Sequence, residues 1–144
     1  MTLEEVKDMV QVSVVLPAYN EVDYLAPAVE KTVETLKIFA ESYEIIIAED
    51  GSTDGTAQKA EELSRKHQCI RHIHRDDRLG RGKALNNAFM QSRGKVIVYM
   101  DLDLATDLKY LEPLVKAITE ENYDFSTGSR LMEKSKAERS FSRS

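Results

Sequence analysis

The sequence lacks several features that mark particular classes of protein. It has no tryptophan, and Cys69 is the single cysteine in 144 residues, so a disulfide cannot form within the chain. One free cysteine is typical of a reducing compartment. No apolar run approaches membrane-spanning length, and residues 1–10 (MTLEEVKDMV) are acidic and amphipathic, unlike a signal peptide. We therefore expect a soluble, cytoplasmic protein.

Positive charge is also in short supply. Lysine and arginine number 20 against 25 acidic residues, and the resulting net charge of −5 argues against a dedicated nucleic-acid-binding protein. Residues 130–144 are the exception, because they hold five basic and two acidic side chains. A basic segment of this kind can contact a diphosphate or an anionic membrane surface. A solvated chain terminus explains the same composition.

Short apolar runs alternate with segments of helical periodicity along the chain. Strands are predicted at residues 12–16, where Pro17 would stop the strand, 44–48, 69–74, 96–100 and 123–128. Helices are predicted at residues 2–9, 22–39, 57–67, 83–92 and 107–121, the last one interrupted by Pro113. This alternation indicates a single domain over residues 1–144, with a layered α/β fold in which helices flank a mostly parallel central sheet.

Polar clusters follow three of the predicted strands. They are Pro17–Glu21 (PAYNE), Glu49–Ser52 and Asp101–Asp103. Ligands of parallel sheets bind at the carboxyl ends of the strands, which meet at one edge. The sequence therefore predicts a binding site where these three clusters converge.

Asp101 and Asp103 form the most distinctive of these clusters. Two residues apart in extended chain, their side chains point to the same side, roughly 6–7 Å apart along the strand. Such like charges repel one another unless they share a divalent cation. The alternative is one aspartate that caps the next helix, beside an unrelated acidic neighbour. We favour the metal site.

A second metal site is a weaker prediction. His72 and His74 share one face of a predicted strand and could bind zinc, but strand parity places Cys69 on the opposite face. We therefore assign both histidines a structural or surface role, and Cys69 a packing role. A G-x-G-x-x-G motif and a Walker A motif are both absent, so a classical dinucleotide or P-loop fold is not supported.

Five motifs together resemble a known family. They are PAYNE (17–21), EDGSTDGT (49–56), GRGKALNNAF (80–89), DLDLAT (101–106) and TGSR (127–130). In this order they resemble family 2 glycosyltransferases of the GT-A fold, which is Rossmann-like. The greatest similarity is to dolichyl-phosphate and other polyprenyl-phosphate mannosyl- and glucosyltransferases, in which a basic segment similar to residues 139–143 follows the TGSR motif.

The resemblance implies roles in binding a nucleotide sugar. Pro17, Tyr19 and Glu21 would wall the nucleotide, with Glu21 accepting hydrogen bonds from the ribose. Asp50 would accept an N–H from the base; the alternative is that it caps the amides of Ser52 and Thr53. We expect Asp54 to be structural.

The resemblance also implies roles in handling the diphosphate. Asp101 and Asp103 would hold Mg²⁺ or Mn²⁺ against it. Arg81 or Lys83 would approach the nucleotide or its phosphates, although either could equally be a solvated surface cation. Planar guanidinium groups suit phosphate recognition, and the arginines concerned are Arg130, Arg139 and Arg143. Among these residues Asp103 and Arg130 are the expected catalytic ones.

The implied reaction is the inverting, metal-assisted transfer of a hexose from UDP-glucose or GDP-mannose to a polyprenyl phosphate, at the cytoplasmic face of a membrane. Family members continue beyond the position of Ser144, so we expect a C-terminally truncated, donor-binding part. Two alternatives remain open. The chain could be a non-catalytic module that binds a nucleotide sugar, or one half of a split glycosyltransferase.

Overall fold

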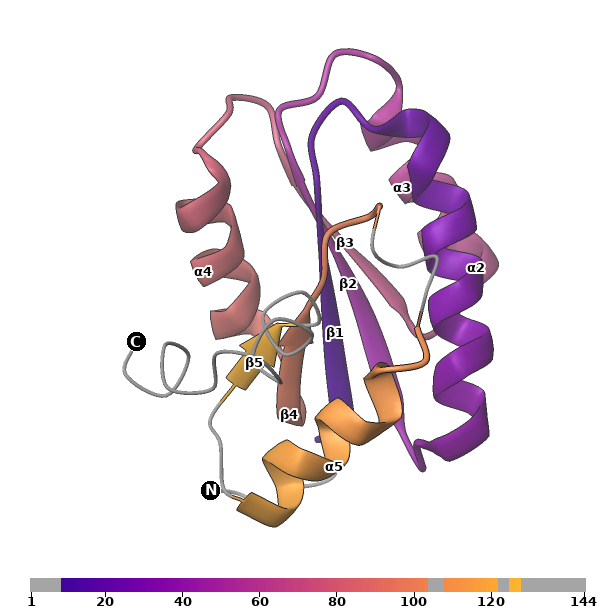
Figure 1. Ribbon diagram of the computed structural model, residues 1–144. Coiled ribbons are helices and arrows are strands. Elements are labelled where there is room, and N and C mark those ends of the chain that lie inside the picture. The colour runs from indigo at the N-terminus through magenta and orange to yellow at the C-terminus, as the bar shows by residue number, and fades with distance from the viewer. Residues whose placement is uncertain (1–8, 104–107, 122–124, 128–144) are drawn as a thin grey trace.

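The computed structural model describes residues 9–103, 108–121 and 125–127. Strands and helices alternate along the chain (Figure 1). They are β1 (Val10–Ala18), α2 (Val22–Phe39), β2 (Tyr43–Asp50), α3 (Thr56–Lys66), β3 (Ile70–Arg75), α4 (Arg81–Gln91), β4 (Gly94–Tyr99), α5 (Leu111–Glu121) and β5 (Phe125–Thr127). The predicted alternation is confirmed.

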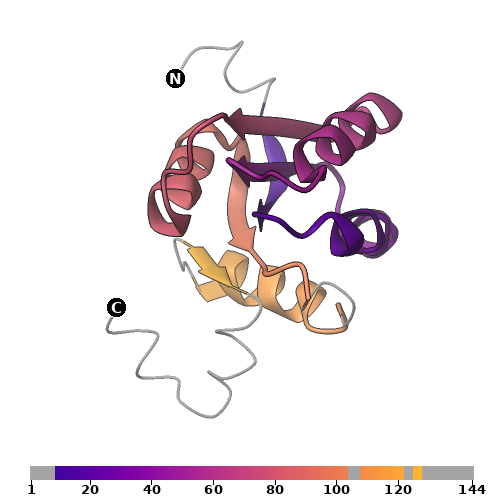
Figure 2. The ribbon, with the colours of Figure 1, turned by 90° about the horizontal axis from the view of Figure 1, so that it is seen from above.

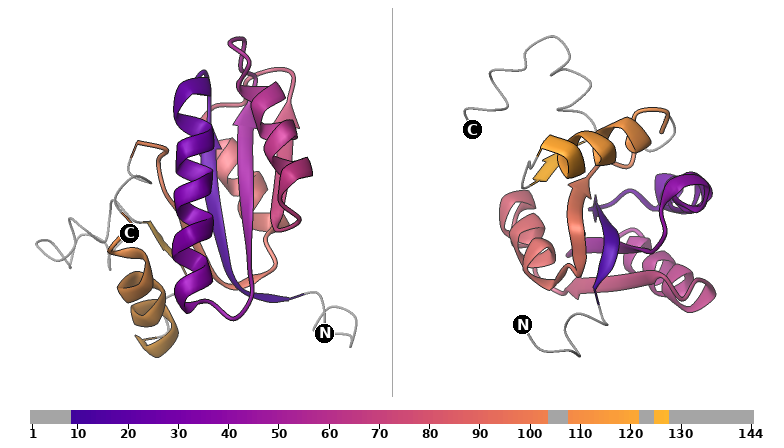
Figure 3. Two further views of the ribbon diagram at one scale, coloured as in Figure 1. Left: turned by 90° about the vertical axis from the view of Figure 1, so that its right-hand side faces the viewer. Right: turned by 90° about the horizontal axis from the view of Figure 1, so that it is seen from below.

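The strands form one sheet in the order β3-β2-β1-β4-β5, and every neighbouring pair is parallel. Helix α4 covers one face, and α2 and α3 cover the other (Figure 2). Helix α5 packs into the same core as α2 and α3, and lies beside α2 (Figure 3). The predicted layered α/β fold with a parallel sheet is therefore confirmed.

The side chains of β2 show how the sheet separates two faces. Ile45 and Ile47 belong to the larger core under α2 and α3, whereas Ile46 and Ala48 belong to the smaller core under α4. Side chains of a strand point alternately to the two faces. The last residues of β2, Glu49 and Asp50, consequently serve opposite faces, with Glu49 on the α3 side.

Most predicted element boundaries are displaced by one to four residues, and two of the displacements involve a proline. Strand β1 runs through Pro17 to Ala18, because pairing with β4 ends at Val15 and the missing N–H of Pro17 leaves no bond to β4 unmade. Helix α5 begins at Leu111 rather than 107, with Pro113 in its first turn, where a proline is tolerated. The predicted helix at residues 2–9 lies almost wholly outside the described residues, and Val10 already belongs to β1.

The packing role predicted for Cys69 is confirmed, but its predicted place within the third strand is wrong. Strand β3 begins one residue later, at Ile70, so the parity argument does not apply to the cysteine. Cys69 packs against the larger core, as expected of a packing residue, and burial raises the pKa of its thiol. Within the described residues, no helix has the length and apolar character needed to cross a membrane.

Candidate functional site

A cavity of about 170 Å³ lies at the carboxyl ends of β1 and β2, beside the start of α4. The parallel sheet brings the loops that follow these strands to one edge, as predicted. Five of the predicted binding residues line the cavity, namely Pro17, Tyr19, Glu21, Asp50 and Arg81. The structure therefore brings together residues that lie up to 64 positions apart in the sequence.

Asp50 anchors the loop in front of α4. Its Oδ1 accepts a hydrogen bond from the backbone N–H of Leu79 at 2.7 Å, and its Oδ2 accepts one from Gly80 at 3.0 Å. The alternative role, capping the amides of Ser52 and Thr53, is wrong. Those two amides donate to other side chains, at Glu49 Oε2 and Asn20 Oδ1.

Arg78 also lines the cavity, although the sequence analysis did not predict it as a site residue. Its guanidinium carbon lies 3.8 Å from the centroid of the Tyr19 ring, within the range of a cation–π contact. Its Nε lies 3.9 Å from Asp50 Oδ2. The charged loop at residues 75–82 signalled a cluster of cations, but an irregular loop has no periodicity that tells which cation turns inward.

A glycine allows this loop to approach the end of β2. Gly51 adopts φ +71°, and a Cβ atom built there would lie 2.7 Å from the backbone nitrogen of Arg78. Both the left-handed conformation and the close approach require glycine. The cavity walls are therefore set by backbone contact as well as by side chains.

Arg81 and Asp101 form an ion pair at the edge of the cavity. Arg81 opens α4 and Asp101 follows β4, so the pair joins two segments at the carboxyl edge. Lys83, the alternative cation, is exposed on α4 and does not line the cavity. Of the two predicted candidates, Arg81 is thus the one placed to meet a ligand.

Glu21 adds a third carboxylate to this region. Burial is the largest cause that raises its pKa, and the charges of Asp101 and Asp103 raise it further. The backbone N–H of Tyr19 and the charge of Arg81 act in the opposite direction. The three carboxylates therefore form an acidic region beside the cavity, in which the two aspartates make ionisation of Glu21 less favourable.

The aspartates fit a hard divalent cation. Carboxylate oxygens are the ligands that Mg²⁺ and Mn²⁺ prefer, and the exposed Asp103 lies two residues from Asp101. Both act on the Glu21 carboxyl, so their charges converge on one region. The other predicted phosphate ligands, Arg130, Arg139 and Arg143, lie outside the described residues.

Asp54 has the structural role expected of it. Its carboxylate accepts hydrogen bonds from the backbone N–H of Thr56 at 3.0 Å and from Val22 at 3.3 Å. These contacts tie the start of α3 to the start of α2.

Comparison with known proteins identifies the family of the chain. A family model described as "Glycosyl transferase family 2" matches residues 13–143, nearly the whole sequence. The chain belongs to glycosyl transferase family 2. A curated relative, "Glycosyltransferase AglD" of Haloferax volcanii, is 52% identical over 125 residues, which are 85% of this chain and 20% of that protein. "Dolichyl-phosphate beta-glucosyltransferase ALG5C" of Trichomonas vaginalis is 36% identical over 109 residues, 72% of this chain and 32% of that protein.

A solved structure matches the fold. It is "Mannosyltransferase PcManGT from Pyrobaculum calidifontis in complex with GDP-Man and Mn2+", with a TM-score of 0.59 and 25% identity over 72% of this chain and 32% of that one. The fold therefore resembles that of a GT-A glycosyltransferase. This family 2 chain spans between a fifth and a third of the length of these relatives.

Proposed function

We propose that this chain binds the nucleotide-sugar donor of a glycosyltransferase that moves a hexose to a polyprenyl phosphate. The observation that carries the proposal is the cavity at the carboxyl edge, where Tyr19, Arg78, Asp50 and the Arg81–Asp101 pair meet. The name of the Trichomonas vaginalis relative, a dolichyl-phosphate glucosyltransferase, supports a polyprenyl-phosphate acceptor, and the PcManGT complex with GDP-Man supports a nucleotide-sugar donor.

Each wall of the cavity offers a different contact to the donor. Tyr19 presents a ring on which a base can stack, and Glu21 presents an acceptor for ribose hydroxyls. Arg78 and Arg81 supply guanidinium groups, which bind phosphate oxygens in pairs. Asp50 already uses both oxygens on backbone donors, so it holds the cavity in shape and has a remaining lone pair for a base N–H.

The two aspartates would hold Mg²⁺ or Mn²⁺ beside the diphosphate. A cation bound there would supply positive charge against the departing nucleoside diphosphate. Arg81 neutralises Asp101 in the protein alone, and it would turn to the diphosphate when Asp101 takes a different counter-charge. Asp101 thus has a partner before and after the donor binds.

The acceptor step needs little from this chain. A lipid phosphate is already an anion, so it can attack the anomeric carbon without a strong general base. The new glycosyl–phosphate bond forms as the bond to the nucleoside diphosphate breaks, and a single displacement inverts the anomeric centre. A lipid acceptor would place the reaction at a membrane surface, and we propose its cytoplasmic face.

Calorimetric titration with UDP and GDP, each with and without Mn²⁺, tests the donor site. We expect one nucleotide to bind with Mn²⁺ and more than 10-fold more weakly without it. Asp101→Asn and Asp103→Asn should remove that Mn²⁺ dependence while circular dichroism shows an intact fold. Arg81→Ala should weaken nucleotide binding yet strengthen binding of Mn²⁺ alone, because Asp101 loses its competing cation.

The titration, combined with an assay of hexose transfer, separates two hypotheses about the function of the chain. Metal-dependent binding together with hexose transfer to a polyprenyl phosphate would establish the enzyme. Binding without transfer would favour a nucleotide-sugar-binding module or half of a split enzyme. A folded chain that binds neither nucleotide would contradict the proposal.

A further inference from the structure

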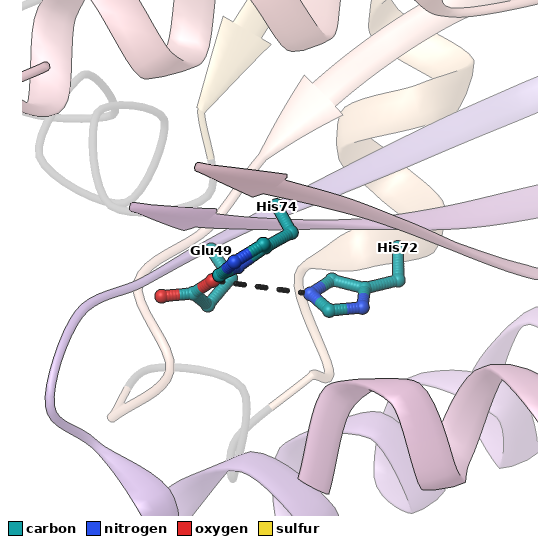
Figure 4. A group of neighbouring side chains, drawn as sticks. All are labelled: Glu49, His72 and His74. Atoms are coloured by element: carbon teal, nitrogen blue, oxygen red, sulfur yellow. Dashed lines mark hydrogen bonds and ion pairs between the residues drawn. The ribbon is translucent and has the colours of Figure 1, made fainter. Parts of the chain in front are cut away.

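We propose that Glu49, His72 and His74 form a second metal site, selective for zinc-like ions and separate from the donor cavity. Glu49 ends β2, and both histidines lie on β3, the edge strand beside it. Figure 4 shows both imidazole rings turned toward the Glu49 carboxylate. The site lies on the α3 side of the sheet. Asp50, which follows Glu49 in the sequence, lines the donor cavity instead.

The pairing of β2 with β3 assembles the three ligands. His74 is in register with Glu49, and His72 lies two residues earlier on the same face. One ligand atom from each side chain can be chosen so that all three lie within 4.8 Å of one another. Tetrahedral zinc, with bonds of about 2.0–2.1 Å, needs ligand atoms roughly 3.3 Å apart. Small side-chain adjustments therefore close the site.

His72 supplies the observation that calls for a ligand. Its side chain is only 8% exposed, and its Nε2 is a buried polar atom with no hydrogen-bond partner. That nitrogen faces Glu49 Oε1 across 4.0 Å, which is too long for a hydrogen bond. Leaving a buried polar atom unpaired is energetically unfavourable. A metal ion between the two atoms would give His72 Nε2 a partner.

Each of the three side chains also has a hydrogen-bond partner for the atom that faces away from the proposed metal, as metal ligands in proteins usually do. The outer ring nitrogen of His72, Nδ1, lies 3.3 Å from Glu61 Oε2, and the outer nitrogen of His74, Nε2, lies 2.8 Å from Asp76 Oδ1. The Glu49 carboxylate accepts the backbone N–H of Ser52 at its Oε2, at 2.6 Å, which leaves Oε1 toward the histidines. Carboxylates behind ligating histidines fix the ring orientation and raise ligand basicity.

The ligand set determines the class of metal. Two imidazoles and one carboxylate suit zinc and similar transition metals, whereas all-oxygen sites suit Mg²⁺ and Mn²⁺. His72 and His74 border an open cavity of about 800 Å³, so solvent can provide a fourth ligand. The donor aspartates and this site therefore select different ions.

A metal-free alternative explains only part of the cluster. Hydrogen bonds with Glu49, which have the larger effect, and with Asp76 raise the pKa of His74, so the two carboxylates favour its charged form without a metal. It gives no partner to His72 Nε2. The alternative predicts a cluster that does not bind metal, so the two readings differ in a measurable way.

Titration of the full chain with Co²⁺, followed by displacement with Zn²⁺, tests the site. A chain carrying Asp101→Asn and Asp103→Asn removes the donor aspartates from the measurement. We expect one equivalent of Co²⁺ to produce the intense visible absorption of a tetrahedral or five-coordinate ion, and Zn²⁺ to abolish it. Mg²⁺ in large excess should have no effect.

Single substitutions locate the bound ion. His72→Gln and His74→Gln should each weaken Zn²⁺ binding at least 10-fold, and Glu61→Gln about 10-fold through the orientation of His72. His74 is 42% exposed, so His74→Gln tests the site even if substitution at a buried ligand impairs folding. The matched control is His67→Gln, because His67 also lies beside a glutamate, Glu30, at 3.2 Å but has no second histidine.

Three results would overturn the site. One is a folded chain that binds no Zn²⁺ at micromolar concentration. Another is full-strength binding in both His72→Gln and His74→Gln. The third is an equal loss of binding in the His67→Gln control. Nucleotide binding at the donor cavity is measured separately and does not enter this test.

Discussion

The two ends of the same parallel sheet place a glutamate in opposite electrostatic surroundings: Glu44 is buried at the amino end, and Glu21 is half-buried at the carboxyl end. At the amino end, the two Glu44 oxygens accept hydrogen bonds from Ser13 at 2.6 Å, from the Arg93 backbone at 2.6 Å and from Arg71 at 2.7 Å. Burial raises the pKa of Glu44, but these three donors together lower it below its ordinary value. At the carboxyl end, Glu21 has a raised pKa.

The difference separates a carboxylate that stabilises the fold from one suited to a ligand. Three donors from this chain balance the charge of Glu44, so its role is structural. At the carboxyl end, Arg81 pairs with Asp101, and the charges of Asp101 and Asp103 help to raise the pKa of Glu21. A cluster of carboxylates is the kind of environment that favours a bound cation, and it is the basis of the metal site proposed above.

The largest effect is expected from removing the Glu44 carboxylate at the amino end of the sheet. Glu44→Ala would leave the Ser13 hydroxyl, the Arg93 amide and the Arg71 charge without their shared acceptor. Removing one partner of a buried ion pair costs about 3–5 kcal/mol of the free energy of unfolding, and urea denaturation at pH 7 measures it. The exposed Glu41→Ala is the control and should change stability by less than about 0.5 kcal/mol. A loss below about 1 kcal/mol in Glu44→Ala would refute the comparison.

An intermediate effect is expected from the glycine that shapes the donor cavity. Gly51→Ala must place a Cβ 2.7 Å from the Arg78 nitrogen at a φ of +71°, which should cost about 1–3 kcal/mol and weaken nucleotide binding as well. Gly82→Ala is the matched control, because a Cβ there meets nothing within 4 Å and the site is helical. That control should be neutral or slightly stabilising. Equal effects at the two glycines would show that the loop contact is unimportant.

The smallest effect is expected from removing the charge of Glu21 at the carboxyl end of the sheet. Because the pKa of Glu21 is raised on folding, its ionisation opposes the folded state once the pH rises above the ordinary value of 4.5. Glu21→Gln should therefore raise the Tm modestly at pH 7 and leave it unchanged at a pH below 4.5, where the carboxyl is protonated in both states. Thermal unfolding across that range measures the difference. A gain in Tm that is equally large at low pH would mean that charge is not the cause.

Much of the fold could be predicted because it depends on local patterns. Apolar runs and helical periodicity located the strands and helices, and the parallel sheet then placed PAYNE, Asp50 and Asp101 at one edge. The position of Arg78 could not be predicted, because the residue lies in an irregular loop without a periodic pattern of inward and outward side chains. Glu49 joins His72 and His74 only through the register of β2 with β3, which local sequence does not reveal. The parity assigned to Cys69 was wrong because it depended on where the strand begins.

Pro17 stands just beyond the point where β1 stops pairing with β4. The last pair between the two strands is Val15 with Tyr99, followed by one hydrogen bond from Met100 to Val15, and proline has no N–H to continue the ladder. This limit on the pairing is covalent, so it holds whatever the solvent or ligand. Pro17 also lines the donor cavity, so a ligand that contacts it there has no β1–β4 hydrogen bond to displace at that residue.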